Sequence, residues 1–528
     1  MPEYLTPGVY IEEIEIGAKP IEGVSTSTAA FLGETERGPT YPQLVTSFPE
    51  YQRIFGGFFG AEKFMPYAAE GFFANGGQRC VVCRIVRIGQ GAAAVASTLT
   101  VGPLEITAVG EGVWGDNIAF RIKPSSDGSA NQFRVQVHYW RERPAAPVDP
   151  LTPESELTDA VKDALRKQAP PQLTEDFDEV TLADASSNSV EKRINNVSNL
   201  IRVRKVGTAN PAPGNLTFLA GGSNGAGDLD LTDYRGRLEP TATDKRSGLA
   251  ALKEPAFEET AILYSPNASA VQGLPDELMT HCEINKYRFA ILDTPKNQAQ
   301  AATLDPRSGA PAGFRASHYA AFYYPWIRIF DSGGGPQKFV PPGGHVAGIY
   351  ARTDIERGVF KAPANEIVRG ALQLEFEVTD GAQAVLNPRG VNVIRAFPGR
   401  GRRVWGARTL SDNTLWKYVS VRRLFIFLEA SIFRGTQWVV FEPNNERLWA
   451  RVKQTITEFL RTQFRAGALL GATEEEAFFV RVDRSTMTDD DINNGRLIVV
   501  IGVAPVRPAE FVIFRIAQLT SSATSVEL

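Results

Sequence analysis

Two short stretches carry residue types that could do chemistry. The segment FPGRGRRVWGARTL, residues 397–410, contains four arginines, three glycines and a tryptophan. Guanidinium groups donate hydrogen bonds to phosphates and carboxylates alike, so this segment could cradle a phosphate, bind nucleic acid or pair with acidic side chains of a protein. The segment CVVC, residues 80–83, has the spacing of a redox-active or metal-binding cysteine pair. The surrounding elements decide between these interpretations.

The cysteine pair lies in an apolar, β-branched run, RCVVCRIVRI, which is typical of a buried strand. Side chains three residues apart on a strand point to opposite faces, so Cys80 and Cys83 do not converge on one ion. The third cysteine, Cys282, belongs to no second CxxC pair that would complete four ligands. We therefore expect structural cysteines and no metal site.

Sequence motifs of catalysis are missing. The four histidines fit no metal-binding spacing. The glycine-rich stretch GGSNGAG, residues 221–227, lacks the Lys-Ser/Thr of a P-loop, and the sequence has no GxSxG elbow. The acidic run at residues 489–491 lacks the alternating ligands of a calcium loop. An α/β enzyme of unknown reaction remains an alternative, but we expect no catalytic residue and no bound cofactor.

The overall charge does not point to nucleic acid or to an anionic membrane. The chain of 528 residues has 56 basic and 60 acidic side chains, so the arginines of residues 397–410 are a local feature. No run of eighteen apolar residues predicts a membrane span. The first residues are acidic and do not have the order of a signal peptide, so we expect synthesis in a cytoplasm. A chain this long also predicts several domains.

The apolar pattern predicts two α/β regions separated by an insertion. Residues 25–90 and 216–344 contain apolar runs followed by turns, such as YRFAILDTP, which are typical of parallel strands with crossover helices. Residues 91–215 alternate polar and apolar side chains, which predicts an inserted β-rich module. Within this module the acidic segment from Pro144 to about Asp178 is predicted to be a mobile loop.

Residues 345–509 are predicted to form a last domain around one long helix. The segment NNERLWARVKQTITEFLRTQFRAG has an apolar face at helical spacing, with Asn444 or Asn445 as its cap and Gly467 at its end. The opposite face is either solvated or binds an acidic partner, and exposed ion pairs there would each be weak. That face carries Arg447, Arg451, Arg461 and Arg465.

Both ends of the chain are strand-like segments without a local hairpin partner. We expect two extended arms, residues 1–24 and 510–528, whose backbone groups pair within their own subunit or with another chain. The candidate pairing residues are Val9, Tyr10, Ile11, Ile14, Phe511, Val512, Ile513, Phe514 and Ile516.

Several long motifs resemble the sheath proteins of contractile phage tails and of phage-tail-like contractile injection systems. In the last domain they include APANEIVRGALQLEFEVTDGAQAVLNPRGVNVIRAFPGRGRRVWGARTL and VRRLFIFLEASIFRGTQWVVFEPNNERLW. Near the front they include TPGVYIEEI, GVSTSTAAFLGETERGP and FFANGGQRCVVCRIV. The resemblance is dense over residues 1–90 and 345–528, looser over 216–344, and absent from 91–215.

The resemblance implies a multidomain, mixed α/β (α+β) tail-sheath fold. The first and last regions of the chain would together build the inner α/β domain, and residues 25–90 would form the first part of the middle or inner sheath region. Residues 216–344 would form a middle domain of subtilisin-like shape that faces outward. The serine motif of subtilisin proteases does not occur in this sequence, so no proteolysis is implied. The inserted module, residues 91–215, would decorate the exterior.

The resemblance also implies a structural subunit rather than an enzyme. Sheath subunits form hexameric rings, stacked helically around an inner tube between a baseplate and a terminal cap, and contraction drives the tube through a target envelope. Neighbouring subunits are linked by strand exchange through their terminal arms. The arginines of the long helix would face an acidic tube. Contacts within the subunit, with neighbouring subunits or with the tube would be made by Arg400, Arg402, Arg403 and Arg408.

We accordingly expect no nucleic acid and no direct membrane insertion. Synthesis and assembly are expected in the bacterial cytoplasm, in a phage tail or a phage-tail-like particle that some systems release from the cell. Phage, bacteriocin, and extracellular or intracellular injection system all stay open as settings. The remaining alternatives are the α/β enzyme and, with less support, a nucleic-acid-binding protein suggested only by residues 397–410.

Overall fold

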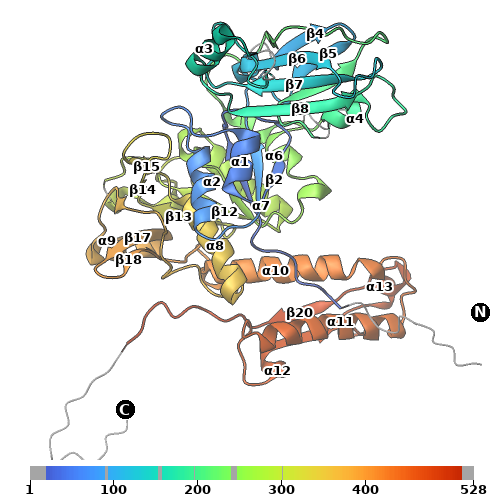
Figure 1. Cartoon of the computed structure of the whole chain (residues 1–528). Helices are drawn as coiled ribbons and strands as arrows, with labels where there is room; N and C mark the ends of the chain where they lie inside the picture. Colours follow the sequence, from blue (N-terminus) through green and yellow to red (C-terminus); the bar gives the residue numbers. More distant parts are fainter. Residues whose placement is uncertain are drawn as a thin grey trace, which may run out of the picture.

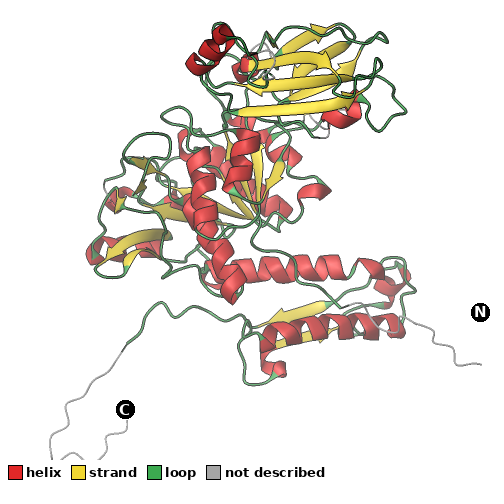
Figure 2. Ribbon diagram, in the orientation of Figure 1, coloured by secondary structure: helices red, strands yellow, loops and turns green. Residues whose placement is uncertain are grey.

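The computed structural model describes residues 20–89, 93–152, 157–195, 197–239, 246–299 and 301–513. They form three bodies stacked one on the next (Figure 1), and each has its own large hydrophobic core. A mixed sheet and helix body lies in the middle, a body made mostly of strands lies on one side of it, and a body dominated by two long helices lies on the other (Figure 2). The predicted mixed α/β class is confirmed.

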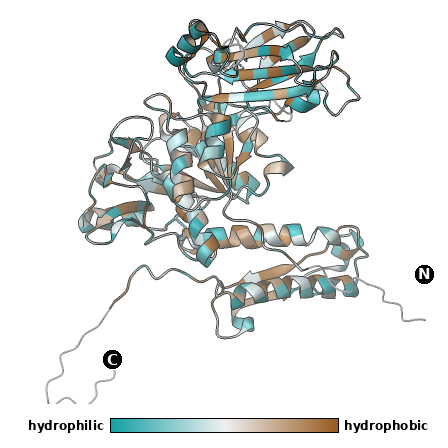
Figure 3. Ribbon diagram, viewed as in Figure 1, coloured by the Kyte–Doolittle hydropathy of each residue, from teal (hydrophilic) through white to brown (hydrophobic). Residues whose placement is uncertain are grey.

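An eight-stranded sheet organises the central body, in the order β18-β17-β13-β12-β11-β1-β3-β2. The six inner strands are parallel, and β2 and β18 add antiparallel edges. Inner strands such as β1 are buried along their whole length, because helices cover the sheet. Strands of the central body appear largely brown in Figure 3. The bounds are β1 Ala29–Gly33, β2 Gln43–Val45, β3 Cys80–Arg84, β11 Ile262–Tyr264, β12 Phe289–Asp293, β13 Ala320–Tyr324, β17 Val391–Phe397 and β18 Gly401–Trp405.

Two helices, α2 (Met65–Ala74) and α8 (Gly343–Arg357), pack closely against each other in front of this sheet (Figure 1). A Cβ atom on Gly344 would lie 2.5 Å from Cα of Ala68, so only glycine permits this approach of the two backbones. The other elements of the central body are α1 Phe48–Phe55, α5 Leu231–Arg235, α6 Gly248–Ala251, α7 Leu274–Asn285, α9 Asp380–Leu386, β14 Ile327–Ile329, β15 Lys338–Val340 and β16 Gln373–Leu374.

The inserted module is a pair of small antiparallel sheets that enclose a separate core. Its chain enters and leaves at neighbouring positions, because Val95 and Ser223 form an antiparallel bridge with hydrogen bonds of 2.8 and 2.9 Å. Its elements are β4 Thr98–Val101, β5 Leu104–Ala108, β6 Ile118–Pro124, β7 Phe133–Tyr139, α3 Asp159–Lys167, β8 Leu173–Val180, α4 Val190–Asn195, β9 Ile201–Lys205 and β10 Thr217–Phe218.

The prediction of a mobile loop from Pro144 to about Asp178 is wrong for its described residues. The segment includes α3 and most of β8, and β8 is an edge strand of the four-stranded sheet. Its Asp149 is buried. The Asp149 carboxylate lies 2.8 Å from nitrogen atoms of Arg121 and Lys123, and 3.3 Å from Nε2 of His138. The acidic composition that predicted mobility therefore serves, at Asp149, to neutralise Arg121 and Lys123 of β6.

Two antiparallel helices dominate the third body, α10 (Val419–Gly435) and α11 (Glu446–Arg465). Asn445 caps α11 through its side chain, which accepts a 3.0 Å hydrogen bond from the Leu448 amide. Ile21 near the start of the described chain packs into the same core. The remaining elements are α12 Glu474–Ala477, β19 Phe478–Arg481, α13 Asp489–Asn493 and β20 Val500–Val503.

The central sheet continues past residue 345, where the sequence suggested a domain boundary. The strands β17 and β18 come from residues 391–405 and complete the sheet that β1 and β3 begin. The third core draws most of its residues from position 424 onward. The amphipathic pattern of residues 391–405 did not reveal which sheet they join, because register and sheet membership depend on contacts distant in sequence.

A buried ion pair joins the central body to the third body. Arg423 on α10 donates to Asp354 on α8 through both terminal nitrogens, at 2.9 and 2.6 Å, and each side chain is 3% exposed. Arg423 also donates a 2.9 Å hydrogen bond to the carbonyl oxygen of Thr26. Three segments that are far apart in the sequence therefore meet at one guanidinium group.

We expect Asp354→Asn to lower the free energy of unfolding by about 3 to 5 kcal/mol, because it leaves the Arg423 charge buried without its partner. The double variant Asp354→Leu with Arg423→Met is expected to lose less than either single variant. Urea denaturation of the subunit measures both. Asp380→Asn is the matched control, because Asp380 pairs with Arg395 at the surface and its side chain is 94% exposed.

Candidate functional site

The cysteine pair forms no reactive or metal-binding site. Cys80 and Cys83 are buried in β3, and burial raises the pKa of both thiols well above the ordinary value. Among the residues that the structure describes, no cluster of histidine, cysteine, aspartate or glutamate could hold a metal ion. The sequence-based assignment of these cysteines to a buried strand agrees with their position in β3.

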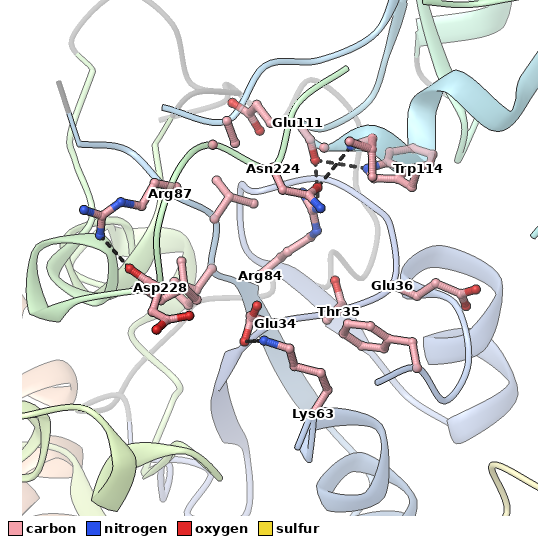
Figure 4. Close-up of a pocket in the computed structure, with 18 of the residues that line it drawn as sticks. Glu34, Thr35, Glu36, Lys63, Arg84, Arg87, Glu111, Trp114, Asn224 and Asp228 are labelled. Carbon is pink, nitrogen blue, oxygen red and sulfur yellow. Dashed lines mark hydrogen bonds and ion pairs between the residues drawn. The ribbon is translucent and has the colours of Figure 1, made fainter. Parts of the chain in front are cut away.

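A cavity of about 420 Å³ lies at the carboxyl ends of β1 and β3, where parallel sheets often bind ligands (Figure 4). Here a loop of the inserted module, including Glu111 and Trp114, forms part of the cavity wall. Arg84 extends from β3 and donates a 2.7 Å hydrogen bond to the carbonyl oxygen of Glu111, and Glu34 pairs with Lys63. Arg84 thus ties the module to the central sheet, whereas the Glu34–Lys63 pair lies within the central body, and the labelled side chains show no nucleophile–base arrangement.

The arginine-rich stretch forms the β17–β18 hairpin at the edge of the central sheet. Arg400 is exposed and donates to the side chain of Asn365 at 3.1 Å. Arg403 donates to the Asn365 carbonyl oxygen at 2.6 Å, and Arg402 is half-buried. Arg400 therefore stays the most accessible of these candidates for a neighbouring subunit.

Arg408 is committed within its own chain. It is buried, and its guanidinium group binds both carboxylate oxygens of Glu510 at 2.8 and 2.6 Å. Burial raises the pKa of Glu510, but hydrogen bonds from Arg408 and Asn387 outweigh that effect and hold the pKa below its usual value. Of the predicted contacts, within the subunit or with a neighbour or tube, Arg408 makes one within the subunit, because its side chain fastens the C-terminal segment to the central body.

The long helix α11 presents three of its four predicted arginines to solvent, namely Arg447, Arg451 and Arg465. The guanidinium group of Arg451 lies 4.7 Å from the ring centroid of Trp438. The fourth, Arg461, is half-buried and pairs with Glu458 and Glu474 at 2.6 and 2.9 Å. The sequence placed all four on one face correctly, but the carboxylate from α12 was not predictable from helical spacing.

Of the predicted arm residues, only Phe511, Val512 and Ile513 fall in the described part of the chain, and all three are exposed. The apolar side chains follow directly after the Glu510 anchor. The remaining candidates lie outside the described residues, namely Val9, Tyr10, Ile11, Ile14, Phe514 and Ile516. Residues 20–24, which the sequence assigned to the N-terminal arm, lie against α10, where the Val24 amide donates to the Ser431 hydroxyl at 3.1 Å.

Two family models match the chain in succession. The phage tail sheath protein central domain matches residues 239–410, and the phage tail sheath C-terminal domain matches residues 411–518. Together they span more than half of the sequence. The chain belongs to the phage tail sheath family. This sheath protein is therefore a structural subunit of a contractile system, as its resemblance to the family implied.

A relative and two solved structures show the extent of the likeness. A Pseudomonas aeruginosa (strain UCBPP-PA14) protein, described as a prophage major tail sheath protein, is 26% identical over 287 residues, 52% of this chain and 70% of the relative. The PVC sheath complex of an extracellular contractile injection system, in its contracted state, has a TM-score of 0.56 and 23% identity over 98% of this chain and 99% of that chain.

A chain in the anti-feeding prophage baseplate has a TM-score of 0.54 and 25% identity, again over 98% of this chain and 99% of that chain. The structural likeness includes the inserted module, for which the sequence offered no resemblance. The fold of the whole described sheath protein is thus shared with sheath chains of injection systems, at low sequence identity.

Sequence reasoning missed the anchoring role of Glu510. It was placed at the start of an apolar arm, whereas its partner Arg408 lies 102 residues away. A glutamate before an apolar run does not indicate which residue it will pair with at that separation.

Within the described ranges, every helix is too short or too polar to span a membrane.

We expect Glu510→Gln to release residues 506–513 from the central body at neutral pH, because the amide cannot replace both charge-assisted hydrogen bonds. Hydrogen–deuterium exchange of this segment measures the loss of protection. Glu377→Gln changes an exposed carboxylate elsewhere and should leave exchange unaltered. Since the pKa of Glu510 is lowered in the folded chain, its stabilising contribution is present above the unfolded pKa, about 4.3, and is lost as the pH falls through the folded value. Equal protection in Glu510→Gln and the parent chain would contradict the anchor.

Proposed function

We propose that copies of this sheath protein stack as hexameric rings around an inner tube, and that contraction drives the tube through a target envelope. The observation that carries the proposal is the likeness over 98% of the chain to a sheath complex in its contracted state. The partners of this role are the inner tube protein, a baseplate and a terminal cap. We assign synthesis and assembly to the bacterial cytoplasm and assign the chain no catalytic activity.

The terminal arms are proposed to link neighbouring subunits by strand exchange. Phe511, Val512 and Ile513 support this role, because three consecutive apolar side chains are exposed directly after the Arg408–Glu510 anchor. An extended apolar segment gains most by adding a strand to an exposed sheet edge of another subunit. The anchor fixes where the arm leaves its own body, so the arm has a defined starting point for each link.

The third body is proposed to face the tube and the inserted module to face outward. In Figure 1 these two bodies lie at opposite ends of the molecule, with the central body between them. The exposed arginines of α11 give the third body a basic face, and many weak ion pairs with an acidic tube would permit release during contraction. Arg461 is left out of this contact because Glu458 and Glu474 already neutralise it.

The triple variant Arg447→Glu, Arg451→Glu and Arg465→Glu is expected to reduce the yield of full-length sheaths on tubes by at least about tenfold. Like charges would oppose each repeated contact, and the effect should weaken as salt rises. Negative-stain electron microscopy with purified tubes measures the yield. The control reverses Lys162 and Arg166, which are exposed on α3 of the inserted module. Normal full-length sheaths from the triple variant would exclude the tube-facing assignment.

Excision of the inserted module is expected to leave sheath assembly intact. Replacing residues 97–221 by two glycines reconnects the chain beside the Val95–Ser223 bridge. This bridge already holds the segment that enters the module next to the segment that leaves it. The excised chain should melt cooperatively and form sheaths of reduced outer diameter in electron micrographs. A folded, monomeric product that never assembles would show that the module is needed between subunits.

A further inference from the structure

The turn between α10 and α11 exposes an aromatic side chain in a strained backbone conformation. Phe441 is fully exposed, with a relative accessibility of 102%, and its φ is 69°, in the left-handed region that residues with a Cβ atom rarely adopt. Val440 beside it is also exposed. A strained backbone that displays two adjacent apolar side chains marks this turn as a candidate contact surface.

The rest of the turn holds this projection in a fixed place. The amide of Glu442 donates to the carbonyl oxygen of Val439 at 3.2 Å, and Trp438 and Val439 pack against the third core. The guanidinium group of Arg451 lies over the Trp438 ring at 4.7 Å. Phe441 therefore projects from a turn whose base is fixed against the third core. We call the exposed pair Val440 and Phe441 the knob.

An apolar groove opens at the other end of α10. Its volume is about 800 Å³, and it lies between the edge strand β18 and the C-terminal segment 506–512. Trp405 and Ala407 line one side, while Pro508, Phe511 and Val512 line the other. Phe511 and Val512 are largely exposed, so the described residues leave this apolar wall uncovered, while the paired side chains of Asp380 and Arg395 line another part of the groove.

The knob cannot fill the groove of its own chain. Tyr418, which lines the groove, directly precedes α10, whereas the turn with Phe441 follows the end of α10. The helix has 17 residues and spans about 25 Å, so the two features lie at opposite ends of the third body, as α10 in Figure 1 shows. A projection at one end and a hollow at the other are the elements of a head-to-tail contact between identical chains, which generates rings or helices.

The charges beside the two features are complementary. Glu442 follows Phe441 and is exposed, and Arg507 is exposed at the lip of the groove. Neither makes an ion pair with another residue that the structure describes. Opposite unpaired charges next to an apolar knob and an apolar groove favour one docking direction over its alternatives.

We propose that Val440 and Phe441 of one subunit insert into the groove under residues 506–512 of a second copy, with Glu442 facing Arg507. This contact rests on the proposed function, since it requires copies of the chain to assemble. In this proposal the groove binds the α10–α11 turn of a neighbouring subunit and not the tube. Because Phe511 and Val512 form one wall, an inserted knob would also hold the first residues of the neighbour's C-terminal arm.

The first test is a charge exchange. Glu442→Arg and Arg507→Glu should each reduce the fraction of chain that sediments as sheath by about tenfold, and combining them in one chain should restore most of it. Phe441→Ala should reduce assembly to a similar extent. Phe330→Ala is the matched control, because Phe330 is an exposed phenylalanine outside the contact. An unchanged melting temperature shows that each variant still folds.

The second test locates the contact directly. Phe441→Cys combined with Ala509→Cys should form a disulfide between subunits on oxidation, giving ladders of linked chains on a denaturing gel. The three native cysteines are buried and do not interfere. Either single variant alone should give no ladder.

The outcomes separate this contact from the proposed function. If the unaltered chain forms sheaths and the charge and Phe441 variants assemble equally well without cross-links, the knob-and-groove contact is wrong while the sheath function stands. If Phe441→Cys cross-links only to a cysteine placed in the tube protein, the groove is not its partner and the contact is equally overturned. If the unaltered chain forms neither rings nor sheaths, the proposed function itself fails.

Discussion

The ion pair between Asp354 and Arg423 is the contact on which the arrangement of the bodies depends. Both side chains are almost fully buried, so each needs the other, and Arg423 also holds the carbonyl oxygen of Thr26. The pair joins α8, which packs tightly on α2, to α10, which carries the third core. Displacing one body from the other would leave a charge without solvent or partner. The buried pair therefore fixes the central body to the third body.

The central sheet of this sheath protein uses polar side chains at the carboxyl ends of its strands for contacts inside the chain. Parallel strands leave their carboxyl ends open for ligands in many enzymes. Here the carboxyl ends of β1 and β3 receive loops of the inserted module, and Arg84 and Glu34 are used for contacts inside the chain. The cavity at this edge is walled in part by the inserted module, and Arg84 joins the module to the central body there.

Local patterns in the sequence predicted the local structure well. The burial of Cys80 and Cys83, the apolar face of α11 and the cap at Asn445 all follow from spacing and residue type. Features that depend on distant partners were not predictable. Arg408 pairs with Glu510, and Arg461 pairs with Glu474 outside α11. Asp149 lies in a loop and pairs with Arg121 and Lys123 of β6. Charged residues read as solvated in a sequence become structural when tertiary contacts supply opposite charges, and no periodicity reports that.

The antiparallel bridge between Val95 and Ser223 has a consequence for how such proteins diversify. Because the chain leaves the central body and returns to it at adjacent residues, the whole module is attached as a side branch with two neighbouring stems. Recombination at those stems can replace one surface domain by another without altering the register of the central sheet. A foreign domain whose two termini lie close together could be inserted at the same junction, so that each subunit would display one copy.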